Sequence, residues 1–185
     1  MPFGTSFPGV LAAARQGAAW AWSGIYKDLA PQVLGYLRAS GAADPEDLTG
    51  EVFLSLVRDI ARFEGDEPNF RSWIFVIAHH RLLDDRRRRN RRPETLVAVD
   101  PGTDNRPGGN VEHEALESLG VDTVRRFIER CFPDQREVLL LRIIAELSLA
   151  EVAEVLGKTV GAVKALQHRG IAAVAREMSR EGVTR

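Results

Sequence analysis

The stretch NFRSWIFVIAHHRLLDDRRRRNRR, residues 69–92, governs how the rest of the chain is interpreted. Its first two-thirds predict one helix with an apolar face, because apolar residues recur at steps of three and four; these are Trp73, Ile74, Ile77, Ala78 and Leu82. Positions 81–92 hold seven arginines and two aspartates, a net charge of +5 on a chain whose net charge is −1. Guanidinium groups match phosphate oxygens, and each neutralised phosphate releases counterions, so this end indicates nucleic-acid binding. The alternative is a solvated basic helix end.

The composition is that of an ordinary globular protein, with 185 residues, 44% hydrophobic and 28% charged. Its charge is segregated, since residues 44–67 contain eight acidic side chains and two arginines, a net of −6. The single cysteine, Cys131, excludes an internal disulfide and fits a reducing compartment. No apolar run is long enough to cross a bilayer, and the N-terminus lacks the pattern of a secretory leader. We therefore expect a cytoplasmic protein without membrane insertion.

The apolar pattern predicts helices throughout the first half of the chain. Residues 1–9 are expected to be a frayed lead-in, followed by a short helix over 10–16 and a longer one over 18–40. Pro31 is expected to kink or break that longer helix. The pair Asp44-Pro45 predicts the start of the next helix, with a carboxylate cap and proline at the first position. That helix should turn Leu48, Val52, Phe53, Leu56, Val57 and Ile60 inward, and Asp47, Glu51 and Arg58 outward.

A second group of helices follows a segment without periodicity. Residues 93–110 contain three prolines, three glycines and two asparagines, which favours a flexible tether. Helices are then expected from about 111 to 132 and from about 134 to 146, and no stretch alternates as a strand would. The prediction is an all-α chain of two small helical domains: a lead-in and short helix over 1–17, a first domain over 18–92, the linker over 93–110 and a second domain over 111–185.

The C-terminal stretch SLAEVAEVLGKTVGAVKALQHRG, residues 148–170, predicts a helix-turn-helix. Ser148 and Glu151 have the spacing of a capping box, and Gly157 can close the first helix in a left-handed conformation. Thr159 can cap a second helix that turns Val163 and Leu166 toward the first. The outward residues Lys164, Gln167, His168 and Arg169 are of the types that reach bases or phosphates in a major groove. A helical hairpin in an unrelated bundle is the alternative.

Together these motifs resemble the small two-domain sigma factors of bacterial RNA polymerase, the extracytoplasmic-function (ECF) class of the sigma-70 family. DPEDLTGEVFLSL (44–56) is similar to the region 2 helix that grips the polymerase coiled coil. FEGDEPNFRSWIFVIAHHRLLDDRRR (63–88) is similar to the segment that melts and reads the −10 element. FPDQREVLLLRIIAELSLAEVAEVLGKTVGAVKALQHRG (132–170) looks like region 4, which binds the −35 element. The resemblance covers nearly the whole chain apart from the tails and the tether.

The resemblance assigns roles to three groups of residues. Asp44 and three residues after it, Asp47, Glu51 and Leu54, are expected to bind the polymerase. Their partners there would be the beta-prime coiled coil and the beta subunit. Contacts to the −10 element fall to Phe63, Asn69, Arg71, Trp73, Ile77, His80, Arg81, Arg86, Arg87, Arg88 and Arg89. Contacts to the −35 element fall to Thr159, Gly161, Lys164, Gln167, His168 and Arg169. The resemblance also implies promoter DNA and an anti-sigma factor as partners, the latter able to hold the protein at the membrane.

Four positions depart from the family pattern, with consequences for recognition. Gly50 replaces the usual glutamine on the polymerase-binding helix, and His80 replaces the usual asparagine near the −10 base. Ala162 and Ala165 replace hydroxyl residues of the recognition helix. The base preferences of the family are therefore not transferred to this chain.

Catalytic and metal chemistry find no support in the sequence. His79 and His80 are adjacent and point about 100° apart on a helix, so they do not share an ion easily. Asp84 and Asp85, beside arginines, are expected to act as ion-pair and capping partners. We expect no cofactor, no metal and no enzyme activity. Two other classes remain open: a stand-alone helix-turn-helix regulator, which should dimerise on a two-fold operator, and a helical enzyme or adaptor with a merely solvated arginine run.

Overall fold

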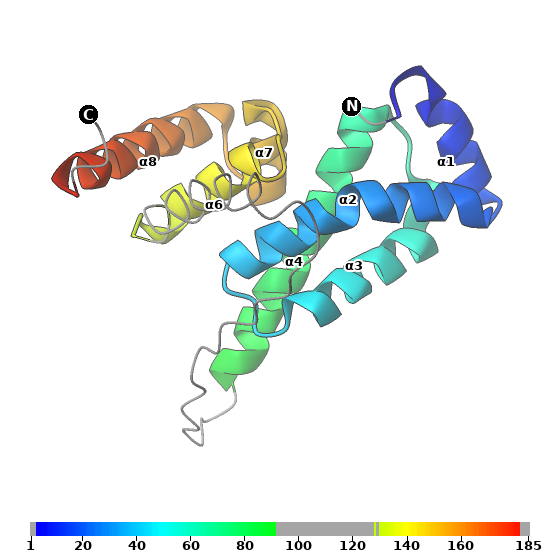
Figure 1. The fold of residues 1–185 in the computed structure, drawn as a ribbon, viewed down its shortest axis with the longest axis horizontal. Coiled ribbons are helices and arrows are strands. Elements are labelled where there is room, and N and C mark those ends of the chain that lie inside the picture. Colours follow the sequence, from blue (N-terminus) through cyan, green and yellow to red (C-terminus); the bar gives the residue numbers. More distant parts are fainter. Residues whose placement is uncertain (1–2, 92–127, 129, 182–185) are drawn as a thin grey trace, which may run out of the picture.

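The computed structural model describes residues 3–91, 128 and 130–181, and all regular secondary structure in these residues is helical. This confirms the all-α prediction (Figure 1). The elements, in chain order, are η1 (Gly4–Ser6), α1 (Phe7–Arg15), α2 (Ala19–Ala39), α3 (Pro45–Asp59), η2 (Ile60–Arg62), α4 (Glu67–Arg91), α6 (Pro133–Ile143), α7 (Leu149–Leu156) and α8 (Val160–Arg180).

The first lobe consists of η1 to α4. The predicted start of α3 is confirmed, because the Asp44 side chain accepts a hydrogen bond from the Asp47 backbone N–H (2.9 Å) and Pro45 follows it in the first turn. Pro31 does not break α2, which continues through it to Ala39. Pro31 is exposed, so the carbonyl that loses its backbone partner lies on the side of the helix that water can reach.

The expectation of a frayed lead-in over residues 1–9 is wrong for the part that the structure describes. Helix α1 begins at Phe7, whose buried ring lies 5.5 Å from that of Phe70 in α4. The backbone N–H of Gly4 donates to Glu67 Oε2 over 2.8 Å. An aromatic anchor and a carboxylate acceptor hold this segment, and both come from a helix distant in sequence.

The second lobe consists of α6, α7 and α8. Helix α6 crosses α8 at Gly170, where a Cβ atom would come within 3.0 Å of Leu139 Cδ1. Glycine at this position lets the two helices approach each other closely. The predicted tether over 93–110 lies outside the described residues, and so does most of the helix predicted from about 111 to 132. Within that range the buried Ile128 is helical, whereas residues 130–132 form a turn and bend before α6.

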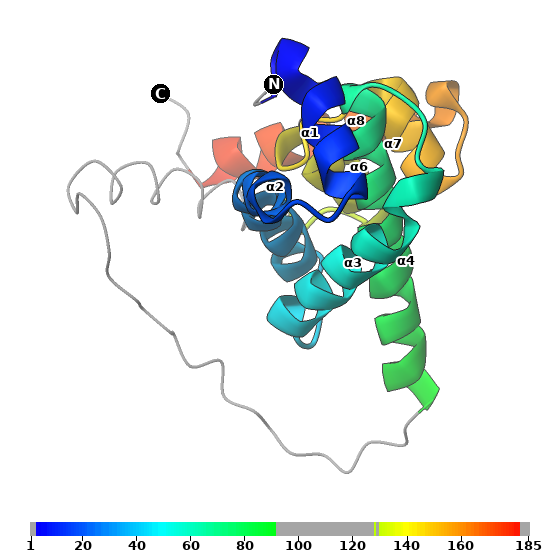
Figure 2. The same cartoon turned by 90° about the vertical axis from the view of Figure 1, so that its right-hand side faces the viewer.

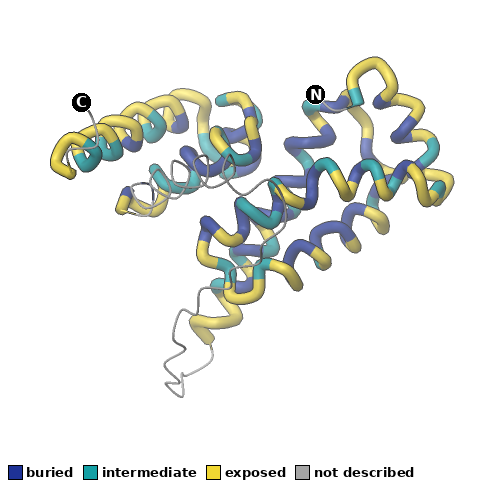
Figure 3. The backbone as a smooth tube through the Cα atoms, in the orientation of Figure 1, coloured by how far each residue is buried: buried dark blue, intermediate teal, exposed yellow. Residues whose placement is uncertain are grey.

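The two lobes pack against each other along α4. Helix α7 contacts α4 as extensively as α3 does, and the ribbons lie side by side in two perpendicular views (Figures 1 and 2). The tube in Figure 3 shows buried residues on the middle of α4, between the lobes, and an exposed C-terminal end. Helix α4 is therefore the common wall of both lobes.

Candidate nucleic-acid interface

A pocket of about 550 Å³ lies where α3, η2 and the start of α4 meet. Four residues predicted from the sequence line it: Phe63, Asn69, Trp73 and Ile77. The rings of Phe63 and Trp73 are stacked, with centroids 5.1 Å apart and planes inclined by 22°. An aromatic wall beside an amide side chain can stack on an unpaired base and form hydrogen bonds with its edge.

The loop before α4 fixes the position of this pocket. The Asp66 carboxylate accepts the Asn69 backbone N–H (3.0 Å), and Asn69 Oδ1 accepts the Asp66 backbone N–H (3.2 Å). This reciprocal pair caps the start of α4. Gly65 has φ +147°, and a Cβ there would lie 2.8 Å from Asn69 Cβ, so only glycine fits the loop.

The arginines at the end of α4 form a basic tip, and they differ in how firmly other groups of the protein hold them. Arg88 lines a hollow with Arg89, Arg91 and Ala43. Arg87 pairs with Asp84 (3.1 Å) and Arg89 with Asp85 (3.0 Å), both within the helix. The Arg87–Asp84 pair is exposed, and pairs of this kind are weak and exchange readily for a phosphate. Arg89 also donates to the Gly41 carbonyl (3.0 Å), and its partner Asp85 is buried. His80 is exposed one turn beyond Ile77, on the same side of α4 as the pocket.

Three arginines predicted to hold DNA are instead bound to groups on other segments of the protein. Arg71 is buried and donates to Gln32 Oε1 of α2. Arg81 joins α4 to α3 by donating to Ser55 Oγ (2.7 Å) and lying 3.5 Å from Glu51. Arg86 donates to the Ser40 carbonyl (2.8 Å) and pairs with Glu137 of the second lobe (2.7 Å).

Arg71 belongs to a charged network near the N-terminus that explains its burial. Burial raises the pKa of Asp28, and the Arg71 guanidinium opposes that rise. We conclude that Arg71 stabilises the first lobe, because a guanidinium held in this way by other helices does not face solvent.

An acidic face with an apolar centre lies on α3. Asp47, Glu51 and Leu54 follow one another at steps of four and three, and Leu54 is 72% exposed. Val57, which the sequence pattern placed inward, is 50% exposed and extends this apolar patch. Asp44 caps α3, and nothing lies within 4 Å of the position of a Cβ on Gly50. Exposed aliphatic side chains with acidic neighbours suit a basic protein partner.

The helix-turn-helix forms as predicted. Ser148 and Glu151 make the complete capping box, Gly157 has φ +60°, and Thr159 caps α8 by accepting the Ala162 backbone N–H (3.2 Å). Val163 is fully buried within the second lobe, while Gly161, Lys164, His168 and Arg169 are exposed and Gln167 is half-buried. The outward face of α8 therefore presents the predicted polar and basic residues.

Among the described residues no group of three or more His, Cys, Asp or Glu side chains has the geometry to hold a metal ion. His79 instead lies inside the protein, where its Nδ1 is 2.9 Å from the Tyr36 hydroxyl. Burial lowers the pKa of His79 and raises that of Tyr36, so Tyr36 donates and the neutral imidazole accepts.

Comparison with known proteins explains why these surfaces occur together. The family models for Sigma-70 region 2 and for Sigma-70, region 4 match residues 25–92 and 123–174. The ECF RNA polymerase sigma factor SigC of Mycobacterium tuberculosis is 34% identical over 131 residues, which cover 71% of this chain and 67% of SigC. The chain belongs to the ECF class of the sigma-70 family. The ECF sigma factor BldN of Streptomyces coelicolor is 33% identical over 165 residues, covering 88% of this chain and 62% of BldN.

Solved structures agree with this family at the level of the fold. CnrH, determined in complex with the cytosolic domain of CnrY, superposes with a TM-score of 0.67 at 22% identity, covering 94% of this chain and 97% of CnrH. RpoE of Bartonella quintana, determined with the anti-sigma factor NepR, gives a TM-score of 0.62 at 17% identity, covering 88% of this chain and 98% of RpoE. In the described part of this sigma factor, no helix is long and apolar enough to cross a bilayer.

Sequence reasoning missed the residues of this sigma factor that join the lobes. Phe75, Glu137 and Glu154 were given no role, although Phe75 is fully buried, Glu137 pairs with Arg86 and Glu154 lines the aromatic pocket. A signal was present, because residues 70–82 carry apolar side chains on more than one face of the helix. Such a helix is expected to be covered on more than one side.

Proposed function

We propose that this sigma factor binds core RNA polymerase through α3, captures a base of the −10 element in the aromatic pocket, and docks α8 on the −35 element. The observation that carries the proposal is the pocket formed by Phe63, Asn69, Trp73 and Ile77, on the same helix α4 that ends in the arginine tip. Extruding a base costs a few kcal/mol, and stacking on an aromatic wall returns about 1–3 kcal/mol for each base.

Each surface has a separate task in this proposal. Asp47, Glu51 and the exposed Leu54 and Val57 bind the polymerase, with Asp44 ordering the start of their helix. The tip residues Arg87, Arg88 and Arg89 hold the backbone of the opened strand, with His80 beside the captured base. Lys164, Gln167, His168 and Arg169 contact the −35 duplex, with Thr159 and Gly161 at the N-terminus of α8, where backbone N–H groups favour phosphate.

The partners and the location follow from this task. Core polymerase and promoter DNA are the required partners, and we propose an anti-sigma protein as the inhibitor. The site of action is the bacterial cytoplasm, where the polymerase and the chromosome are. The protein supplies binding and strand separation and takes part in no chemical step of its own.

Reconstituted transcription tests the proposal. Purified protein is added to sigma-free core polymerase with a panel of promoter fragments, and transcript starts are sequenced. Promoter-specific initiation that requires both proteins is expected. Tight binding to a two-fold operator without polymerase, and no initiation, would identify a stand-alone regulator instead.

A further inference from the structure

The end of α2 is held by two arginines from the C-terminal half of α4. Arg86 Nη2 donates to the Ser40 carbonyl (2.8 Å), and Arg89 Nη2 donates to the Gly41 carbonyl (3.0 Å). Both carbonyls lie just beyond α2, at the end of a helix, where carbonyl groups lack backbone partners and positive charge is favoured. Gly41 has φ +77°, a left-handed conformation that turns the chain away from α2 and toward α3.

A buried carboxylate of α4 holds the other side of this turn. Asp85 Oδ2 accepts the Ala43 backbone N–H (3.4 Å) and lies 3.0 Å from Arg89 Nη2. The Asp85 side chain is only 12% exposed, whereas that of its neighbour Asp84 is 58% exposed and pairs with Arg87. Asp85 therefore binds the turn, while Asp84 faces solvent.

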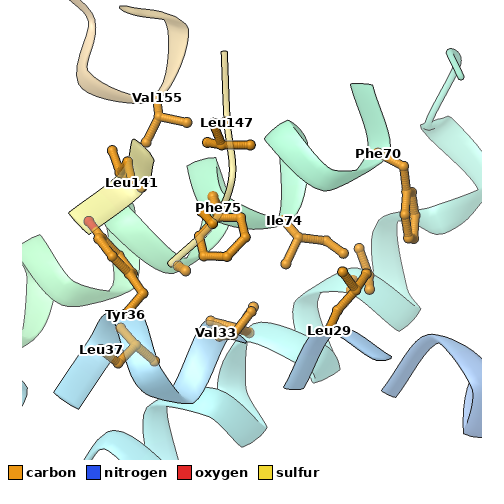
Figure 4. Packing of buried hydrophobic residues seen from close by; sticks show 14 of the residues in the cluster. Leu29, Val33, Tyr36, Leu37, Phe70, Ile74, Phe75, Leu141, Leu147 and Val155 are labelled. Atoms are coloured by element: carbon orange, nitrogen blue, oxygen red, sulfur yellow. The ribbon is translucent and has the colours of Figure 1, made fainter. Parts of the chain in front are cut away.

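The body of α2 is fixed on α4 by the core and not by these polar contacts. Val33 and Tyr36 of α2 lie against Phe75 of α4, and Leu147 of the second lobe lies on the other side of that ring (Figure 4). The rings of Tyr36 and Phe75 meet edge-on with centroids 5.8 Å apart, and all four side chains are fully buried. Helix α2 is therefore a fixed base, from which the turn at 40–43 leads to α3.

The turn determines where α3 begins. Asp44, the capping residue of α3, follows Ala43 directly, and its side chain accepts the Asp47 backbone N–H. Asp47 belongs to the proposed polymerase surface, together with Glu51 and the exposed Leu54. Any displacement of the turn therefore displaces the first turn of α3 and the side chains that it presents.

We infer that Asp85, Arg86 and Arg89 are positioning residues for polymerase binding: they hold the turn at 40–43 and so fix the start of α3. This inference rests on the proposed function of α3. It gives a second task to two arginines that the family resemblance assigned to the −10 element. Both contacts of Arg89 use Nη2, so its Nη1 and Nε can still donate to a phosphate.

Binding to sigma-free core polymerase tests the inference, with each full-length variant titrated onto immobilised core polymerase. Asp85→Ala should bind about tenfold more weakly, equivalent to ~1.4 kcal/mol, because the Ala43 N–H loses its acceptor and Arg89 loses its partner. Asp85→Asn keeps an acceptor for that N–H and should recover most of the affinity. Asp84→Ala removes the same charge from the exposed neighbour and should bind as the wild type does.

A double-mutant cycle separates positioning from a general loss of stability. If Asp85 acts through α3, Asp85→Ala should weaken binding by a smaller factor in a Leu54→Ala background than in the wild type, and the two factors should differ at least about threefold. A variant that is merely less folded would lose the same factor in both backgrounds. Equal losses, or no recovery of affinity in Asp85→Asn, would overturn the inference.

The same titrations distinguish this inference from the proposed function. Normal binding by Leu54→Ala would show that α3 does not bind the polymerase there, and the inference would be wrong with it. Weak binding by Leu54→Ala together with normal binding by Asp85→Ala would reject the inference alone.

Discussion

The same type of residue serves different purposes at different depths in this protein. Arg71 and Arg88 lie on one helix, yet Arg71 is buried against Gln32 whereas Arg88 lines an open hollow at the tip. Trp73 and Trp20 differ similarly, since Trp73 stacks on Phe63 and Trp20 is 64% exposed away from the pocket. These pairs give residue-level tests with built-in controls.

Trp73→Ala should reduce promoter opening by about 10- to 100-fold. The change removes one ring of the stacked pair, and base stacking on an aromatic side chain is worth about 1–3 kcal/mol. Open complexes are counted by permanganate reactivity of the −10 thymines with reconstituted holoenzyme. Trp20→Ala is the control and should keep full opening. A normal yield from Trp73→Ala would mean that the base binds elsewhere.

Arg71→Ala and Arg88→Ala should have opposite signatures. Removing Arg71 leaves Gln32 and Asp28 without their buried partner, and we expect a loss of about 1–3 kcal/mol in the free energy of unfolding. Removing the exposed Arg88 should leave stability within ~0.5 kcal/mol. Arg88→Ala should instead weaken promoter binding and reduce the salt slope by about one. Urea denaturation and binding at several salt concentrations provide both measurements, and identical behaviour of the two variants would refute the assignment.

At the level of elements, the helices start where local side-chain acceptors replace missing backbone partners. Helices α3, α7 and α8 begin at Asp44, Ser148 and Thr159, each of which accepts a backbone N–H from three residues ahead. These caps are short-range and can be found in sequence. The α2–α4 contact instead depends on the buried Tyr36–His79 hydrogen bond, which joins residues 43 positions apart.

Ser148→Ala should destabilise the second lobe by about 1 kcal/mol, because it removes the acceptor of the capping box at the start of α7. The free energy of unfolding is obtained from chemical denaturation followed by circular dichroism. Ser179→Ala is the matched control, since that hydroxyl donates only to a carbonyl of its own exposed helix, and it should cost little. Equal losses would show that the cap contributes nothing specific.

The stability of the α2–α4 contact should fall as the pH is lowered from 7 through about 6.5, the ordinary pKa of histidine. Burial lowers the pKa of His79 in the folded state, and of the charges that face it only Glu137 opposes this, while His80, Arg86 and Lys158 add to it. The unfolded chain therefore binds the proton first, and stability is lost until the pH falls below the folded pKa, by up to ~1.4 kcal/mol for each pH unit crossed.

Denaturation midpoints measured at several pH values test this dependence. His79→Gln keeps an acceptor for Tyr36 and cannot titrate, so its stability should vary less with pH than that of the wild type. His80→Gln, at the exposed neighbouring position, should retain the wild-type slope. If His79→Gln keeps the full slope, another group is responsible.

At the scale of the whole molecule, the two lobes share helix α4 as a common wall. Besides Phe75, a second contact joins them where Gly35 of α2 faces Ile144, with a Cβ position 3.5 Å from Ile144 Cγ2. There is room for a methyl group there and for nothing much larger. The arrangement of lobes is therefore sensitive to a side chain that touches neither the pocket nor the arginine tip.

Gly35→Leu should wedge the lobes apart and increase the radius of gyration measured by small-angle X-ray scattering of the free protein. The added side chain has no space between α2 and Ile144. We expect that separating the two lobes costs less free energy than repacking the side chains within them. Gly9→Leu, at a position with nothing within 4 Å, is the control and should leave the radius unchanged. An unchanged radius of gyration for Gly35→Leu would show that the contact between the lobes repacks locally and that the lobes stay together.

The local features of this protein were determined by the sequence alone. Capping residues, Gly157 and the apolar periodicity predicted the all-α fold and the helix-turn-helix, because they act over three to seven positions. The residues of the aromatic pocket were assigned by the resemblance to the sigma-factor family. Only the tertiary structure decided which arginines are held by other segments, that Val57 faces outward, and that Glu154 of α7 lines the pocket. Those outcomes depend on packing between segments about 25 to 90 residues apart. The partner of such a side chain is set by the fold of the whole chain and leaves no periodic trace in the sequence around it.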